Sequence, residues 1–226
     1  MIQSQLMLDI GAFALSAVIA YLLGSINFAI IVSKIYAHDD VRKYGSKNAG
    51  MTNILRTYGK LPAFFTLLGD FFKGVLAVVI ARMIFSAMGV DAFDAGYAAG
   101  FFALLGHLYP VFFGFKGGKG VLTSLGIILV VNPLVFCILL IIFLPVLFIT
   151  RIVSLVSVTG AVLYPFLTLI VDLCLRHPAL FDFLFALLFS VFVIYKHRGN
   201  IQRLLNGTER RIGDKKPSEV QKEERQ

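Results

Sequence analysis

The stretch VLTSLGIILVVNPLVFCILLIIFLPVLFIT, residues 121–150, is apolar almost throughout and is interrupted by Asn132-Pro133. A transmembrane helix needs about 20 apolar residues, so this stretch is too long for a single crossing of the membrane. Asn-Pro favours a turn and disfavours the helical conformation of the residue before the proline. We therefore predict two helices here, a short one over 121–131 and a second one over 134–150.

The composition of the whole chain indicates a membrane protein. Of its 226 residues, 58% are hydrophobic and 15% are charged, and the mean hydropathy is +0.84. Globular proteins have roughly 45–50% apolar and 25% charged residues. These figures exclude a disordered chain, a coiled coil and a secreted domain held by disulfides. In a membrane protein, the net charge of +8 raises the question of which side of the bilayer the basic residues occupy. No nucleic-acid partner is expected.

Further apolar segments flank this stretch. We predict an all-α polytopic membrane protein with seven transmembrane helices, in one domain that extends over residues 1–212. A polar tail over 213–226 is expected to be disordered. The predicted spans are 8–36, 61–86, 95–113, 121–131, 134–150, 152–175 and 179–195.

The basic residues of the loops are distributed unequally between the two sides. If the N-terminus is outside, most of them lie in the inside segments, and Arg176 is the only basic loop residue on the other side. This distribution agrees with the positive-inside rule. If 121–149 were a single span, Arg151 and the tail would lie on the opposite side from the other basic loops. We therefore expect an outside N-terminus and a cytosolic C-terminus.

A first polar motif, GSKNAGMTNILR, occupies residues 45–56 of an inside loop. Its small residues allow several backbone N–H groups to point at one anion. Ser46, Asn48 and Thr52 add polar side chains, and Arg56 adds a guanidinium that can bind phosphate with two parallel hydrogen bonds. The alternative is an ordinary polar connection.

A second motif, FKGGKG at residues 115–120, precedes the predicted helix 121–131. Free N–H groups at a helix N-terminus bind anions, so Gly117, Gly118, Lys119 and Gly120 are predicted to bind phosphate. The spacing is one residue too short for a nucleotide-binding P-loop, and Gly120 replaces its magnesium-binding Ser/Thr. The alternative is a flexible turn with two membrane-anchoring lysines.

Two further inside segments carry polar residues. Ser154 follows Arg151 between two spans and can cap a helix or bind phosphate. In HRGNIQRLLNGTE, residues 197–209, His197 can act as a general base, and Asn200 can donate a hydrogen bond to an oxyanion. A structural role for His197 is the alternative.

Two charges lie within the predicted span 61–86. Asp70 and Lys73 are three residues apart and share a helix face, where charges are costly unless they are paired. We predict that they form an ion pair that supports the site structurally. His107, near the end of the next span, is interpreted as a capping residue or a catalytic one.

The sequence lacks a cluster of His, Cys and acidic residues with metal-ligand spacing, so no metal or other cofactor is expected. Two anion sites at one membrane face suggest group transfer to or from a lipid. One alternative is a transporter for organic phosphates, which would show internal repeats and broken helices at the midplane. Here no repeat is visible, and the polar residues lie at one face. A second alternative is an alcohol-phosphatidyltransferase, which would need a cluster of metal-binding aspartates that this sequence lacks.

Five pieces of the chain, in this order, resemble the bacterial membrane-integral acyl-phosphate:glycerol-3-phosphate acyltransferase family. They are GSKNAGMTNILR (45–56), DFFKG (70–74), GHLYPVFFGFKGGKGVLT (106–123), RIVS (151–154) and HRGNIQRLLNGTE (197–209).

The resemblance implies transfer of a fatty acyl group from acyl phosphate to the sn-1 hydroxyl of glycerol 3-phosphate. The products would be 1-acyl-glycerol 3-phosphate (lysophosphatidic acid) and phosphate, in phospholipid biosynthesis. It also implies a bacterial cytoplasmic (inner) membrane location, with the active site facing the cytosol and a soluble partner acyltransferase that makes the acyl phosphate.

The resemblance implies roles for individual residues as well. Ser46 and Arg56 match the essential positions of the first motif, and His197 and Asn200 match those of the third. Residues 117–120 match the glycerol-phosphate-binding loop, and Glu209 matches a structurally important acid.

Acyl phosphate is already an activated mixed anhydride. We therefore expect the protein to act by orienting the two substrates and offsetting their charge, without forming an acyl-enzyme. Either His197 or an oxygen of the donor phosphate accepts the proton of the hydroxyl. An acyl-enzyme at Ser46 is disfavoured because no nucleophile elbow surrounds it.

Overall fold

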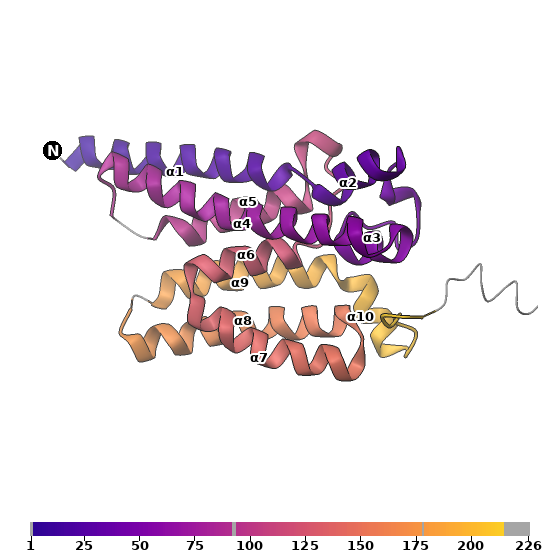
Figure 1. Cartoon of the computed structure of the whole chain (residues 1–226). Helices are drawn as coiled ribbons and strands as arrows, with labels where there is room; N and C mark the ends of the chain where they lie inside the picture. Colours follow the sequence, from indigo (N-terminus) through magenta and orange to yellow (C-terminus); the bar gives the residue numbers. More distant parts are fainter. Residues whose placement is uncertain (1, 92–93, 178, 215–226) are drawn as a thin grey trace, which may run out of the picture.

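The structure is a computed structural model that describes residues 2–91, 94–177 and 179–214. All of the regular structure in these ranges is helical, which confirms the predicted all-α class (Figure 1). Four helices are shorter than the rest: α2 (Phe28–Ala37), α3 (Met51–Tyr58), α6 (Val121–Val131) and α10 (Arg198–Leu205). Two 3₁₀ turns, η1 (Val41–Lys43) and η2 (Val111–Phe113), lie in the loops. The long helices are α1 (Ile2–Ser25), α4 (Lys60–Met88), α5 (Ala95–Leu108), α7 (Pro133–Thr150), α8 (Val153–Leu175) and α9 (Ala179–Lys196).

Six helical segments of the described chain are long and apolar enough to cross a membrane. The first of them combines α1 and α2, and the others correspond to α4, α5 with η2, α7, α8 and α9. Helix α6 has the predicted bounds, but its 11 residues rise only about 16 Å, compared with a hydrocarbon core about 30 Å thick. The structure therefore supports six of the seven predicted spans by length.

The predicted span 8–36 corresponds to the candidate span Gln5–Ala37, but the chain breaks within it, between α1 and α2. Asn27 is fully buried there, and its side chain accepts a hydrogen bond from the N–H of Ile30, which starts α2. The carbonyl of Ile26 accepts a hydrogen bond from the Lys73 ammonium at 2.8 Å. A helix can break inside a membrane protein when other groups satisfy its free backbone atoms, and Asn27 and Lys73 do so here.

Small residues allow the helices to approach closely. A Cβ atom added to Gly126 of α6 would lie 2.1 Å from the carbonyl oxygen of Phe71 in α4, and one added to Gly74 would lie 2.4 Å from that of Thr123. Gly24 of α1 and Ala103 of α5 are equally close. Such small-residue contacts are typical of helix packing in membranes. They place α6 in the middle of the bundle, where it contacts α4, α5 and α7 (Figure 1).

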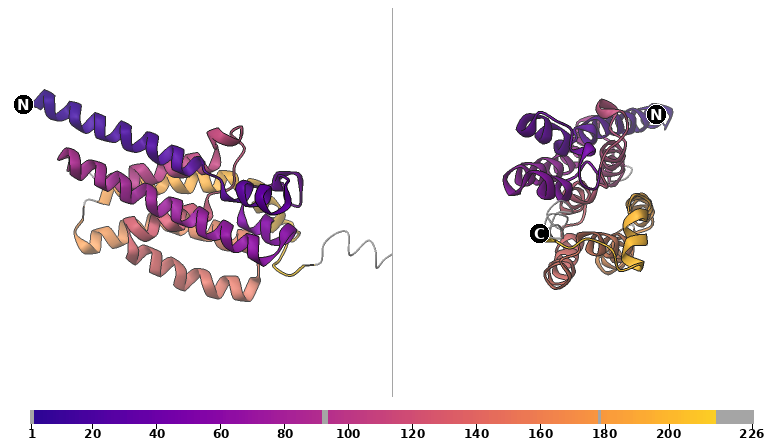
Figure 2. Two further views of the ribbon diagram at one scale, coloured as in Figure 1. Left: turned by 45° about the horizontal axis from the view of Figure 1, so that its top comes forward. Right: turned by 90° about the vertical axis from the view of Figure 1, so that its right-hand side faces the viewer.

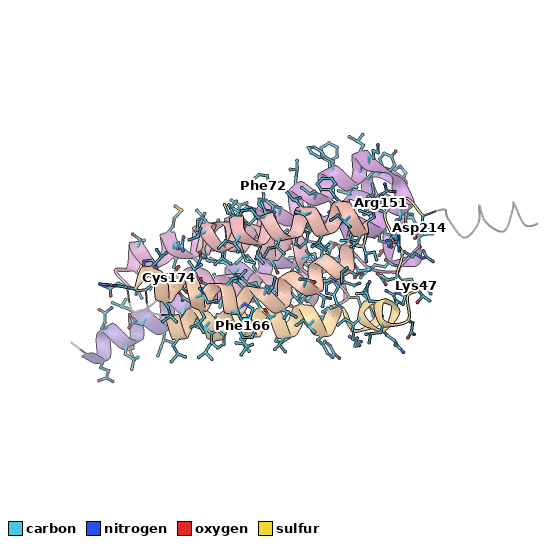
Figure 3. The ribbon with its side chains drawn as sticks, turned by 90° about the horizontal axis from the view of Figure 1, so that it is seen from below. Lys47, Phe72, Arg151, Phe166, Cys174 and Asp214 are labelled. Carbon is cyan, nitrogen blue, oxygen red and sulfur yellow. The ribbon has the colours of Figure 1, made fainter. Side chains whose placement is uncertain are left out.

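The helices run roughly parallel, as the end-on view of Figure 2 shows. The loops that carry the four polar motifs meet at one end of the bundle, opposite the N-terminus (Figure 1). Figure 3 shows Lys47, Arg151 and Asp214 at that end and Cys174 toward the other. Of the predicted tail, Gly213 and Asp214 form part of an exposed turn, and 215–226 lie outside the described residues.

We expect Gly126→Ala to destabilise the protein, although alanine normally favours a helix. The added methyl group would meet the Phe71 carbonyl, which belongs to the backbone and cannot rotate away. Overpacking of this kind costs roughly 1–3 kcal/mol, so the Tm in detergent should fall by several degrees. Gly11→Ala is the matched control, because its nearest neighbour would be the Met88 side chain at 3.7 Å. An equal Tm for both variants would contradict the close α4–α6 packing.

Candidate active site

The polar motifs surround one cavity of about 500 Å³ at this end of the bundle. Its walls come from the loop before α3, from α3 itself, from the N-termini of α6 and α8, and from the α9–α10 junction with the segment after α10. Most of the predicted site residues line it: Ser46, Asn48, Thr52, Arg56, Asp70, Lys119, Gly120, Ser154, His197, Asn200 and Glu209.

The cavity has a charged part and an apolar part. Arg56, Lys119 and Arg203 lie in its wall, and beyond them it continues between α6 and α7 past Leu125, Phe143 and other apolar side chains. A smaller apolar pocket shares Leu125 and Phe143 and extends toward α8 and α9. The arrangement therefore suits an amphiphile with an anionic head.

Asn53 organises the first polar loop. It is 1% exposed, and its amide nitrogen donates hydrogen bonds to the carbonyls of Val41, Tyr44 and Asn48 at 3.1 Å. Its amide oxygen accepts one from the N–H of Ser46 at 3.0 Å. Sequence reasoning missed this role, although a lone Asn on the first turn of a helix that follows a Gly-rich loop signals such a hydrogen-bonding centre.

Gly117 and Gly118, which the sequence predicts to bind phosphate, use their backbone N–H groups within the protein. These donate to the carbonyls of Leu108 and His107, at 3.3 and 3.2 Å, and neither glycine lines the cavity. A Cβ atom on Gly118 would lie 2.3 Å from Nε2 of His107 and 2.4 Å from the carbonyl oxygen of Ala49. The two glycines are therefore required for close packing against α5 and the first loop.

Lys119 and the N-terminus of α6 remain free to bind an anion. Gly120 precedes α6 with a φ of +84°, which favours glycine, and no side chain caps the helix. Gly120, Val121 and Leu122 line the cavity, so the first N–H groups of α6 lie at its wall. The pKa of Lys119 is lowered to about 8, mainly by burial and also by the nearby Arg203 and Arg56, against the opposing effect of Glu209.

Glu209 joins α8 and α10 at the cavity wall. Its carboxylate accepts hydrogen bonds from the Ser154 hydroxyl at 2.8 Å, the Asn200 amide at 2.6 Å and the Arg203 guanidinium at 2.7 Å. Although burial opposes them, these hydrogen bonds hold the pKa of Glu209 below its usual range. The helix-capping interpretation of Ser154 is wrong, because its hydroxyl binds Glu209 and α8 has no side-chain cap.

Asn200 connects this carboxylate to Lys119. Its amide oxygen accepts a hydrogen bond from the Lys119 ammonium, while its nitrogen donates to Glu209. One N–H of Asn200 is therefore occupied, and the predicted oxyanion contact would have to use the second one. The chain Glu209–Asn200–Lys119 fixes the position of the ammonium group.

His197 is 3% exposed and lines the cavity. Its Nδ1 lies 2.8 Å from the carbonyl oxygen of Val193, so Nδ1 carries the proton and donates it, which leaves Nε2 as an acceptor. Burial lowers the pKa of His197 to about 4, and the nearby Lys119 contributes to the shift. The ring is therefore neutral at pH 7, as a group that accepts a proton must be.

Arg56, on α3, also lines the cavity. Burial and the neighbouring Arg210 lower its pKa, and its guanidinium contacts the carbonyl oxygen of Arg210 at 3.3 Å. The segment after α10 is held further by the N–H of Ile212, which donates to the Arg151 carbonyl at 2.7 Å. These contacts close one side of the cavity.

A buried charge network reaches the cavity wall, where Asp70 and His107 line it. The Lys73 ammonium donates to Asp70 at 2.8 Å and to Nδ1 of His107 at 2.9 Å, in addition to the Ile26 carbonyl. The predicted ion pair is therefore present, and it includes His107, which sequence analysis left between a capping and a catalytic role. His107 does not cap α5, because the helix ends at Leu108 and its C-cap residue is Tyr109.

Comparisons with known proteins show the family of this chain. The family model described as glycerol-3-phosphate acyltransferase matches residues 14–207. The chain belongs to the glycerol-3-phosphate acyltransferase family. The family member of Clostridioides difficile (strain 630) is 46% identical over 209 residues, which cover 92% of this chain and 100% of that protein. That of Neisseria meningitidis serogroup C / serotype 2a (strain ATCC 700532 / DSM 15464 / FAM18) is 42% identical over 199 residues, or 88% of this chain and 96% of that protein.

Solved structures agree in fold as well. The chain resembles the crystal structure of PlsY (YgiH), an integral membrane glycerol 3-phosphate acyltransferase, in its glycerol 3-phosphate form. The TM-score is 0.77 with 37% identity, over 89% of this chain and 96% of that one. The lysophosphatidic acid form gives 0.74 with 36% identity, over 89% and 95%. This glycerol-3-phosphate acyltransferase is therefore an integral membrane enzyme of phospholipid biosynthesis.

We expect kcat/KM for glycerol 3-phosphate to fall above pH 8. We expect the ammonium form of Lys119 to attract the substrate phosphate. This form is present below its pKa of about 8 and is lost as the pH rises through that value. The fall should approach about tenfold per pH unit, because kcat/KM reports the ionisation of the free enzyme.

Two variants of Lys119 test this assignment. Lys119→Ala removes a charge-assisted hydrogen bond worth roughly 1.5–3 kcal/mol, so the KM for glycerol 3-phosphate at pH 7 should rise about 10- to 100-fold. In this variant the KM should change little further above pH 8. Lys119→Arg keeps its charge at high pH and should shift the decline upward. A decline that persists unchanged in both variants would assign the pH dependence to another group.

Proposed function

We propose that the enzyme transfers a fatty acyl group from acyl phosphate to the sn-1 hydroxyl of glycerol 3-phosphate, giving 1-acyl-glycerol 3-phosphate and inorganic phosphate. The observation that carries this proposal is the single cavity in which Arg56 and Lys119 lie on different walls and an apolar extension leads between α6 and α7. Two cationic groups suit two phosphates, and the extension suits one acyl chain.

The two phosphates are assigned to different walls. Glycerol 3-phosphate binds Lys119 and the free N–H groups of α6. The phosphate of the donor binds the loop with Ser46, Asn48 and Thr52, together with Arg56, and its acyl chain follows Leu125 and Phe143. With this assignment, the carbonyl carbon of the donor lies between the walls, where the hydroxyl of glycerol 3-phosphate can reach it. Holding both reactants in one orientation removes much of the entropic part of the barrier.

The reaction needs no covalent intermediate with the protein. The sn-1 oxygen forms a bond to the carbonyl carbon, the bond from that carbon to the phosphate oxygen breaks, and phosphate leaves with the electron pair. The proton of the hydroxyl passes either to Nε2 of His197 or to an oxygen of the departing phosphate, and Asn200 and Arg56 stabilise the developing negative charge. Ser46 is a less suitable nucleophile, because its described hydrogen bond uses its backbone N–H and not its hydroxyl.

The membrane arrangement belongs to the same proposal. All seven apolar segments, with α6 as a short one, cross the bacterial cytoplasmic membrane, the N-terminus lies outside, and the cavity opens to the cytosol. A soluble acyltransferase supplies the acyl phosphate. The concentration of basic residues around the cavity end supports this orientation.

The donor is tested with purified enzyme and labelled glycerol 3-phosphate. We expect lysophosphatidic acid with palmitoyl phosphate and none with palmitoyl-CoA, because the apolar extension and two phosphate cradles leave no assigned place for a nucleotide. One phosphate should appear for each product molecule. Efficient turnover with palmitoyl-CoA would refute the proposed donor, while activity with neither donor would call for a third acyl carrier.

The orientation is tested by labelling single cysteines in a background without Cys137 and Cys174. Lys47, Asp91 and Thr208 are exposed, so cysteines at these positions can react with a reagent that does not cross the membrane. In intact cells we expect labelling at 91 and none at 47 or 208. Opposite results for 47 and 208 would contradict an odd number of spans.

A further inference from the structure

Arg42 connects the two loops that form the cavity. It lies in η1, before the first polar motif, and its Nη1 donates hydrogen bonds to the carbonyl oxygens of Phe113 and Lys116, at 2.8 and 2.9 Å. Both acceptors belong to the turn that leads into residues 117–120. A single guanidinium nitrogen thus ties the loop that carries Ser46 to the loop that carries Lys119.

The other edge of the guanidinium is fixed by Asp40. The carboxylate accepts hydrogen bonds from Nε, at 3.0 and 3.1 Å, and from Nη2 at 2.7 Å. It also accepts one from the backbone N–H of Arg42 at 2.9 Å, so that it is itself anchored in η1. Because the guanidinium is planar, holding one edge determines where the other edge points.

The turn that receives Arg42 is shaped for this contact. Gly114 and Phe115 both have left-handed conformations, with φ of +67° and +58°, and the N–H of Phe115 donates to the Pro110 carbonyl at 2.9 Å. This backbone brings the carbonyls of Phe113 and Lys116 to the same donor. Residues that line the cavity follow closely after both partners of this contact: Lys119 comes three residues after Lys116, and Ser46 comes four residues after Arg42.

We propose that Arg42 is a positioning residue that fixes the two substrate loops relative to each other, so that the hydroxyl of one substrate meets the carbonyl of the other. This inference rests on the proposed function, in which each loop holds one substrate. Without Arg42, each loop keeps its own anion-binding groups, so each substrate still binds. Their mutual orientation is lost, and water then competes with the hydroxyl for the acyl carbon, giving fatty acid and phosphate.

Arg42→Met removes every donor of the guanidinium and keeps an unbranched side chain. We expect kcat to fall by about 10- to 100-fold, while both KM values change by less than about threefold. The ratio of phosphate released to lysophosphatidic acid formed, corrected for a reaction without enzyme, should rise above the wild-type value. This ratio is independent of the fraction of active protein, so a merely structural effect would not change it.

Lys43→Met is the matched control. Lys43 is the next residue of η1 and has its own acidic partner, Asp39 at 2.6 Å, and its side chain is 67% exposed. Its described hydrogen bond and ion pair both go to Asp39, and neither involves the second loop. It should keep the wild-type kcat and ratio. An unchanged ratio in Arg42→Met, or the same effect in both variants, would overturn the role of Arg42. Failure of the wild type to use palmitoyl phosphate would instead refute the proposed function.

Discussion

The ammonium group of Lys73 is the interaction on which the architecture of the site depends. It is buried in the middle of the bundle and donates to three acceptors from different elements: the Asp70 carboxylate, the His107 ring and the Ile26 carbonyl. A buried charge of this kind is costly unless all of its donors are used, and here they are. The same contacts stabilise the break between α1 and α2 and fix the His107 ring. Because that ring packs against Gly118, one charge network determines where the second loop lies.

The position of α6 follows from this network and from close helix packing. After α5 the chain leaves the bundle and returns so that Gly117 and Gly118 bond to Leu108 and His107, and Gly120 lies beside Leu104, a turn before the end of α5. The N-terminus of α6 is therefore recessed within the bundle rather than placed at its end. This explains why α6 is short and why its free N–H groups face a cavity. A full-length helix in the same place would fill the space that the substrates need.

The sequence predicted much of this from two simple signals. Apolar runs located the helices, and Asn132-Pro133 separated α6 from α7, because hydrophobicity and proline act locally. The break at Asn27 was missed because the run around it is apolar on both sides, and the groups that stabilise it, Lys73 and Asp70, are distant in sequence. The Gly-rich loop was recognised, yet which of its N–H groups are free depends on carbonyls of α5. Similarly, the roles of Asn53 and Arg42 depend on backbone atoms that only the folded loops bring together.

The charges of the cavity also constrain how the reaction ends. Lys47, Arg56, Lys119 and Arg210 line it without an ion pair among the described residues, whereas Glu209 binds Arg203. Burial is the main cause of the lowered pKa values of Lys119 and His197, and the excess of positive charge also lowers them. Bound phosphates offset this excess. In the proposed reaction two phosphate groups enter and two leave, so electrostatic attraction holds products as firmly as substrates. What changes is the attachment of the acyl chain, which moves from the phosphate that leaves to the one that Lys119 holds. With this proposal, we expect the free phosphate, which has no apolar part, to leave into water and the lipid product to leave along the apolar side of the cavity.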